Sequence, residues 1–171
     1  MLMRTLAFVI VAGVLATQVP GLFEALDQPA AQGGDGGTPN LTKITATPSG
    51  TTVLKADTTG HFRGTFKLNG KPVEALVDTG ASLVAINETT ARRIGVSLAS
   101  LDFKYPIATA NGQTQAAHVR LQRVEIGSIK VDAVDAFVLR DKALSGTLIG
   151  MSFLKRLGAY SAQDGQLRLV R

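Results

Sequence analysis

The residues of this chain that are best suited to chemistry are five consecutive ones, Asp78-Thr79-Gly80-Ala81-Ser82. They follow an apolar run at residues 73–77 that reads as a buried strand, so the carboxylate stands where a strand breaks into a turn. Gly80 lets the chain fold back beneath that carboxylate and present an amide N–H to it, and the Thr79 hydroxyl can lock the turn. A carboxylate that is held by the backbone in this way is suited to acid–base chemistry.

The same residues also fit a plain structural turn, because Asp and Gly are common turn residues at the end of a strand. An Asp-Thr-Gly triplet is expected by chance in roughly a few per cent of chains this long. The motif therefore indicates a catalytic carboxylate only if the elements around it support that interpretation.

The composition excludes several classes of protein. The chain of 171 residues has room for one domain with flanking segments. It has no Cys, which excludes a disulfide framework, a thiol nucleophile and a Cys-based metal site. Its two His residues, His61 and His118, are far apart and lack ligand spacing, so we expect neither a metal nor a cofactor. The net charge is +5, but no basic run is interleaved with aromatics, so we expect no nucleic-acid partner.

Residues 1–26 have the composition of a membrane-targeting segment, in which Arg4 precedes a long apolar stretch. A helix over residues 6–26 would rise about 30 Å, which is the thickness of a bilayer core. Pro20 makes this a poor span, and the small residues near Ala16 fit a cleavable signal instead. We favour a membrane anchor with Arg4 on the cytoplasmic side. With either interpretation the rest of the chain is exported.

The remainder of the chain divides into two parts. Residues 27–58 read as a flexible linker or extended arm, because residues 27–40 are rich in Gly, Pro and Gln and residues 41–55 alternate only weakly. An edge strand over residues 41–55 is the alternative. Residues 59–171 read as the folded domain. We predict turns at Asn69-Gly70, Asn111-Gly112 and Gly127-Ser128, short helices over 88–94 and up to 157, and strands over 61–68, 73–77, 103–110, 113–121, 124–126, 129–134, 136–139 and 166–170. Without a long helix or a βαβ crossover, this pattern predicts a small all-β barrel.

The order of these elements resembles the retropepsin-type aspartic proteases, and more narrowly their bacterial single-domain, membrane-tethered members. The resemblance covers residues 59–171 and rests on four phrases, Gly60-His61-Phe62, Asp78-Thr79-Gly80-Ala81-Ser82, Thr109-Ala110-Asn111-Gly112 and Leu148-Ile149-Gly150-Met151-Ser152-Phe153-Leu154. It implies a single-lobe retropepsin-like acid-protease barrel with one or two short helices, active as a homodimer. It also implies a tether in the bacterial inner membrane with the protease domain in the periplasm, or a free periplasmic protein if the N-terminal segment is cleaved.

Aspartic proteolysis needs two carboxylates that share one proton, yet this chain has one Asp-Thr-Gly motif. The near-repeat Asp57-Thr58-Thr59-Gly60 lacks the adjacent Gly and a preceding apolar strand, so we interpret it as unrelated to catalysis. We therefore expect the second carboxylate to come from the Asp78 of a second copy, on the two-fold axis of a homodimer.

The resemblance also implies roles for the residues around Asp78. Thr79 would hydrogen-bond across the two-fold axis, and the Gly80 N–H would face the carboxylate, with Ala81 completing the turn. Ser82 would donate to the outer oxygen of Asp78, or its hydroxyl would simply face water.

Two further segments take part in the implied site. The hairpin at Thr109-Ala110-Asn111-Gly112 would be a flap that closes over the substrate, or a plain surface hairpin. Leu148-Ile149-Gly150 would brace the active turn from beneath. The expected substrate is an extended peptide segment of a protein, paired through backbone hydrogen bonds.

Three other functions are compatible with parts of the sequence pattern. A non-catalytic, exported, dimeric peptide-binding module of the same fold is the alternative, since fold does not fix function. A phosphoryl-transfer enzyme with Asp78 as nucleophile is disfavoured because the chain lacks a parallel α/β pattern. A Ser hydrolase is disfavoured because residues 80–84 lack the second Gly of a nucleophile elbow.

Overall fold

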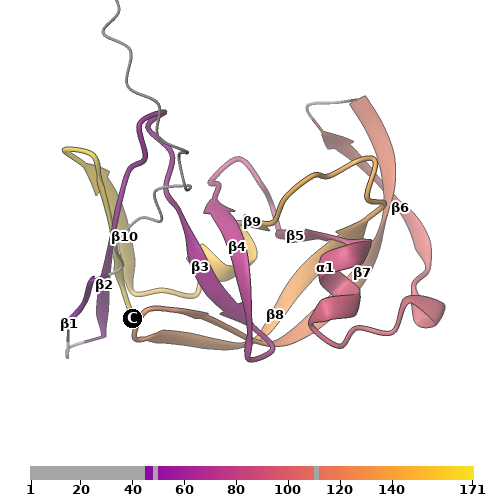
Figure 1. Cartoon of the computed structure of the whole chain (residues 1–171), viewed down its shortest axis with the longest axis horizontal. Coiled ribbons are helices and arrows are strands. Elements are labelled where there is room, and N and C mark those ends of the chain that lie inside the picture. Colours follow the sequence, from indigo (N-terminus) through magenta and orange to yellow (C-terminus); the bar gives the residue numbers. More distant parts are fainter. Residues whose placement is uncertain (1–44, 48–49, 110–111) are drawn as a thin grey trace, which may run out of the picture. The chain divides into compact units, whose positions relative to one another are not determined.

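The structure is a computed structural model that describes residues 45–47, 50–109 and 112–171 (Figure 1). These residues form a four-stranded sheet with the order β1-β2-β11-β10 and a seven-stranded sheet with the order β3-β4-β9-β5-β8-β7-β6. The strands are β1 Thr45–Thr47, β2 Thr51–Lys55, β3 Arg63–Leu68, β4 Lys71–Val77, β5 Val84–Asn87, β6 Phe103–Thr109, β7 Gly112–Ile126, β8 Ile129–Leu139, β9 Leu148–Ile149, β10 Ala159–Gln163 and β11 Gln166–Val170. The helices are α1 Glu88–Arg93 and α2 Met151–Leu154, with a single 3₁₀ turn at Leu98–Ser100. The expected all-β fold with two short helices is confirmed.

Local sequence signals explain the turn and the helix next to the candidate site. At the predicted hairpin turn, Asn69 and Gly70 have positive φ values of 49° and 77°. A two-residue turn between twisted antiparallel strands requires this backbone, and Asn and Gly tolerate it. Asn87 caps α1, because its side chain accepts a hydrogen bond from the Thr90 N–H at 2.8 Å. The predicted turn and the predicted helix are therefore confirmed.

The largest difference from the predicted elements is the length of two strands. Four short strands are expected over residues 113–139, but β7 and β8 are two long strands, paired from Ala116↔Leu139 to Ile126↔Ile129 except at Gln122 and Ala133, where Ala133 has a positive φ of 53°. The polar residues at the expected breaks pair across the strands instead. Arg123 contacts Asp132 at 2.6 Å, and the Asp135 carboxylate contacts Arg120 at 3.3 Å. Cross-strand ion pairs of this kind are compatible with an uninterrupted strand.

Part of the predicted linker belongs to the folded unit. Residues 51–55 form β2, which pairs with β11 and places Leu54 opposite Leu167. Leu54 is fully buried, and the Thr52 hydroxyl donates to the Ile126 carbonyl at 3.1 Å. No helix among the described residues is long and apolar enough to cross a membrane. The predicted anchor, residues 1–26, lies outside the described residues.

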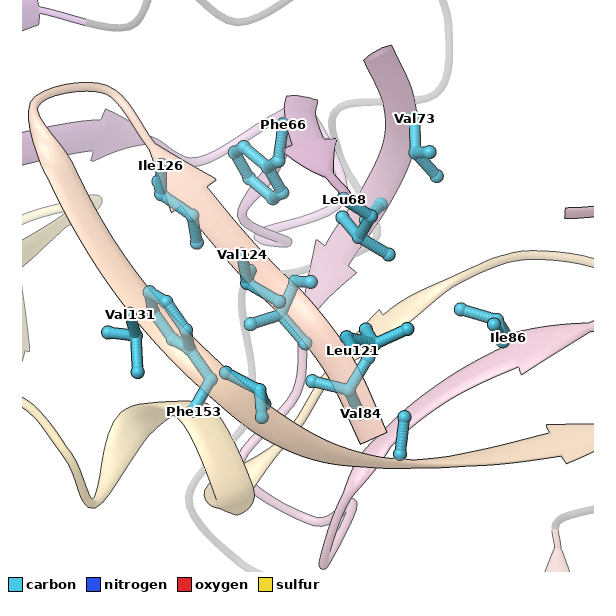
Figure 2. Close-up of a cluster of buried hydrophobic side chains, with 14 of the residues drawn as sticks. Phe66, Leu68, Val73, Val84, Ile86, Leu121, Val124, Ile126, Val131 and Phe153 are labelled. Atoms are coloured by element: carbon cyan, nitrogen blue, oxygen red, sulfur yellow. The ribbon is translucent and has the colours of Figure 1, made fainter. Parts of the chain in front are cut away.

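The hydrophobic core fixes the strand that leads to Asp78. Alternate residues of β3 and β4 point inward, and Phe66, Leu68 and Val73 pack in one cluster with side chains of β5, β7, β8 and α2 (Figure 2). Phe66 and Phe153 are among the largest fully buried side chains. Full burial of one such side chain stabilises the fold by roughly 1.5–3 kcal/mol. The core therefore holds the end of β4 in place.

Candidate active site

Asp78 stands directly after β4, and its backbone is held from both sides. The Val77 N–H donates to the Phe62 carbonyl at 2.9 Å, and the Asp78 N–H donates to the Ile149 carbonyl at 3.0 Å. Strand β9 runs parallel to the end of β4 and pairs Val77 with Ile149. The carboxylate therefore projects from a fixed backbone at the point where a strand becomes a turn.

The turn itself presents one hydrogen-bond donor to the carboxylate. The Gly80 N–H lies 2.8 Å from Asp78 Oδ1, and the Ala81 N–H donates to the Asp78 carbonyl at 3.3 Å. A Cβ at position 80 would stand 3.1 Å from Asp78 Oδ1, which is tight, so glycine gives the carboxylate its room. Within the described part of the chain, the Asp78 carboxylate accepts no other hydrogen bond, and the exposed Ser82 does not donate to it.

The short segment around Gly150 supports the turn from beneath. The Met151 N–H donates to the Ala81 carbonyl at 2.8 Å, and the Ser152 N–H donates to the Ser82 carbonyl at 3.1 Å. A Cβ at Gly150 would overlap the Leu83 carbonyl oxygen and stand 2.5 Å from the Ala81 carbonyl oxygen. The Leu148-Ile149-Gly150 segment lies next to the turn, with Ile149 fully buried and Leu148 half-buried, and its role as a brace stays a prediction.

Ser152 is a supporting residue for which the sequence indicated no role. Its hydroxyl donates to the Asp135 carbonyl at 2.7 Å and accepts from the Val84 N–H at 2.9 Å. These bonds join α2 to β8 and to β5, the strand that follows the active turn. The contacts connect residues far apart in the chain, so local sequence patterns carry no signal for them.

A pocket of about 330 Å³ opens beside Asp78. Its walls come from the segment that precedes β3, from the end of β4 and from β10 and β11, with the lining residues Gly60, His61, Phe62, Val77, Asp78, Thr79, Tyr160, Ser161, Ala162 and Leu167. Strand β10 was not predicted, because all five of its residues are exposed and show no apolar alternation. Its position beside Asp78 is therefore a finding of the structure alone.

The near-repeat at Asp57 has a different local structure. Asp57 Oδ1 accepts from the Thr59 N–H at 2.9 Å, from the Thr59 hydroxyl at 2.6 Å and from the His61 N–H at 2.9 Å. Asp57 Oδ2 contacts Arg63 Nε at 3.1 Å. The Thr59 hydroxyl and then the His61 amide lower the pKa of Asp57 to about 2. The carboxylate of Asp57 is thus occupied in fixing its own loop.

The predicted flap hairpin is described only in part. Strands β6 and β7 pair up to Thr109↔Gly112, and the Thr109 hydroxyl donates to the Gly112 carbonyl at 2.9 Å. Ala110 and Asn111 lie outside the described residues, so the flap stays a prediction. Among the residues that the structure describes, no group of His, Cys, Asp or Glu side chains could hold a metal ion.

Comparisons with known proteins agree with this geometry. Residues 64–156 match the family described as "gag-polyprotein putative aspartyl protease". An uncharacterized protein of Sinorhizobium sp is 41% identical over 68% of this chain and 50% of its own length, and an uncharacterized protein of Rickettsia prowazekii is 30% identical over 67% of this chain and 49% of its own. The chain thus spans about half the length of these curated relatives.

A solved structure gives the fold a further match. The crystal structure of a retropepsin-like aspartic protease from Rickettsia conorii is similar with a TM-score of 0.62 and 29% identity, covering 75% of this chain and 92% of that one. The Asp-Thr-Gly turn at the end of β4 and its brace at Gly150 lie inside the segment matched by the family. This chain belongs to the retropepsin-like aspartic protease family.

Proposed function

We propose that this protein is an aspartic endopeptidase in which Asp78 and the Asp78 of a second copy form the catalytic pair. The observation that carries the proposal is the Asp78 turn, in which the carboxylate has a single donor among residues 45–47, 50–109 and 112–171, the Gly80 N–H, and lies beside an open pocket. Each chain has one such turn, and the chemistry needs two carboxylates. A symmetric homodimer supplies the second one and places both on its two-fold axis.

In the proposed reaction the pair shares one proton. One carboxylate takes a proton from a water molecule, whose oxygen attacks the peptide carbonyl carbon, while the protonated carboxyl donates to the carbonyl oxygen. The tetrahedral intermediate then collapses: one of its hydroxyls returns a proton to the pair, the C–N bond breaks and the amide nitrogen receives a proton from the pair. Thr79 would stiffen the paired turns across the axis, and the β6–β7 hairpin would close over an extended peptide.

We also propose that residues 1–26 tether the protease domain to the periplasmic face of a bacterial inner membrane. Support comes from the apolar stretch after Arg4 and from the resemblance to membrane-tethered family members. A cleaved signal, which would leave a free periplasmic protein, is the competing arrangement. The intact mass of the purified protein separates the two, because cleavage removes the N-terminal segment.

The proposed activity is tested with the purified full-length chain and a diverse peptide mixture. Wild type and Asp78→Asn are incubated side by side, and new peptide ends are identified by mass spectrometry. We expect cuts with the wild type alone, and a specific activity that falls on dilution as dimers dissociate. A folded wild-type sample that binds peptides without cutting them would instead identify the peptide-binding module.

A further inference from the structure

We propose that a groove over the outer face of β3 and β4 binds the part of the substrate that lies several residues from the cut, and that it favours acidic side chains there. The inference rests on the proposed protease function. The groove has a volume of about 1260 Å³, more than the ~300–1,000 Å³ typical of small-molecule pockets. Its floor includes Thr65, Glu74 and Leu76, and its far wall includes Thr90 and Arg93 of α1.

The groove and the pocket beside Asp78 are lined by neighbouring residues of the same two segments. In the loop before β3, Asp57 and Thr59 line the groove, and the next residues, Gly60 and His61, line the pocket. Strand β4 divides in the same way, since its residues from Pro72 up to Leu76 contribute to the groove and the residues that follow line the pocket. Leu76 is two residues from Asp78, about 7 Å along an extended chain. A peptide in the groove can therefore continue to the catalytic carboxylate.

An open strand edge faces this groove. The Leu76 N–H donates to the Thr147 carbonyl on the β9 side, and β9 pairs with β4 only at Leu76 and Val77. Because a strand points its N–H groups alternately to either side, the N–H and C=O of Glu74 also point to the β9 side, where the described residues offer no strand partner. An extended peptide can pair there by strand addition, up to Pro72, which has no N–H to donate.

The free charge of the groove is positive. Its charged lining residues are Lys55, Asp57, Arg63, Glu74 and Arg93. Arg63 and Asp57 neutralise each other across 3.1 Å. Lys55, Glu74 and Arg93 are exposed and form no ion pair or side-chain hydrogen bond within the described residues. Two cations therefore face one carboxylate, and an acidic peptide segment complements them.

The test compares two neighbouring arginines of α1. Arg92 and Arg93 are both exposed in its last turn, but only Arg93 lines the groove. Two peptides share one cleavage sequence and carry either Asp or Lys about four residues from the cut, which is the reach of an extended chain from Asp78 to Glu74. We expect wild type to cleave the Asp peptide with about three-fold higher kcat/KM, the size of an exposed charge pair, and to lose this preference in high salt.

The Arg93→Glu variant should abolish or invert the preference, and Arg92→Glu should keep it. Equal effects of the two substitutions, or no preference in the wild type, would overturn the groove as a binding surface. If the wild type cleaves no peptide at all, the proposed protease function fails by itself. Fluorescence anisotropy of the same labelled peptides with the full chain then decides on the groove, and equal affinities for the two peptides would overturn it.

Discussion

Two aspartate turns in this chain have similar sequences and opposite local structures. Asp57 accepts hydrogen bonds from four donors, namely two groups of Thr59, the His61 N–H and Arg63 Nε. Among the described residues, the Asp78 carboxylate accepts one, from the Gly80 N–H. The extra residue between Thr and Gly at Asp57 lets the hydroxyl and amides of the loop close on the carboxylate. At Asp78 the glycine follows at once and leaves most of the carboxylate free.

The comparison shows which surroundings suit a carboxylate to structure and which suit it to chemistry. An aspartate with several donors is stabilised as the anion and gives up little of its hydrogen-bonding capacity to a substrate. An aspartate with one donor can still accept from a water molecule or share a proton with a second carboxyl. The supporting bonds at Asp78 go to its backbone, and those at Asp57 go to its side chain.

The largest expected effect is the difference in peptide-cleavage activity between substitutions at Asp78 and at Asp57. Asp78→Asn should lower kcat/KM by about 10²–10⁴-fold or more, because a group that transfers protons is lost, while the folded structure is kept. Asp57→Asn should retain most of the activity. Peptide cleavage and thermal melting of both variants provide the check, and strong turnover by Asp78→Asn would remove that residue from the mechanism.

Addition of a single methyl group at Gly150, beneath the Asp78 turn, should destabilise the protein. Gly150→Ala would press a Cβ against the carbonyls of Leu83 and Ala81, and such overpacking costs about 1–3 kcal/mol. Gly146→Ala is the matched control, because its Cβ would meet open space, and its effect should stay within about 0.5 kcal/mol. Urea unfolding measures both; equal stabilities would show that the backbone near Gly150 is looser than described.

A smaller effect is expected at Ser152. Ser152→Ala would leave the N–H of buried Val84 without its acceptor, which should lower the free energy of unfolding by about 1 kcal/mol. Ser152→Thr keeps the hydroxyl and should recover part of the loss. If the turn depends on this bond, kcat should fall more than KM rises in the alanine variant. An alanine variant with wild-type stability and kcat would show that the bond is dispensable.

The smallest effect is a pH dependence specific to Asp57. Its pKa is lowered from 3.8 to about 2 in the folded chain, so its ionised form favours folding at pH values above 3.8, and this contribution disappears as pH falls toward 2. Wild type should therefore exceed Asp57→Asn in urea midpoint at pH 6, with the gap narrowing at pH 2. A gap that is independent of pH would show that the charge of Asp57 does not contribute.

Local sequence signals were enough to predict the Asp78 turn, the Asn69-Gly70 hairpin and α1, because each depends on residues close together in the chain. The segment around Gly150 contacts residues far away in the chain, and only the resemblance to the family implied its place beneath the turn. Apolar alternation at residues 61–68 predicted β3, and the apolar run at residues 73–77 predicted the end of β4; the inner faces of both strands are apolar.

Features that depend on distant partners could not be predicted. Strand β10 has no apolar face and exists through its pairing with β11. Weak alternation at residues 41–55 does not distinguish an extended arm from an edge strand, whereas the structure places β2 between β1 and β11 with Leu54 buried opposite Leu167. The Ser152 hydroxyl forms hydrogen bonds with β8 and β5, two strands that are remote from it in the sequence. Sequence periodicity reports which side of an element is buried, and it does not report which element covers it.

Strand β7 has one consequence for local stability. Its first four residues, from Gly112 to Gln115, include no buried side chain, whereas Ala116 and Ala117 are fully buried and the strand ends on buried Ile126. Amide hydrogens in the first part should exchange with solvent through local opening, and those in the second part only through global unfolding. Residues 112–115 can therefore open locally while the rest of the same strand stays closed, with the boundary expected near Gln115.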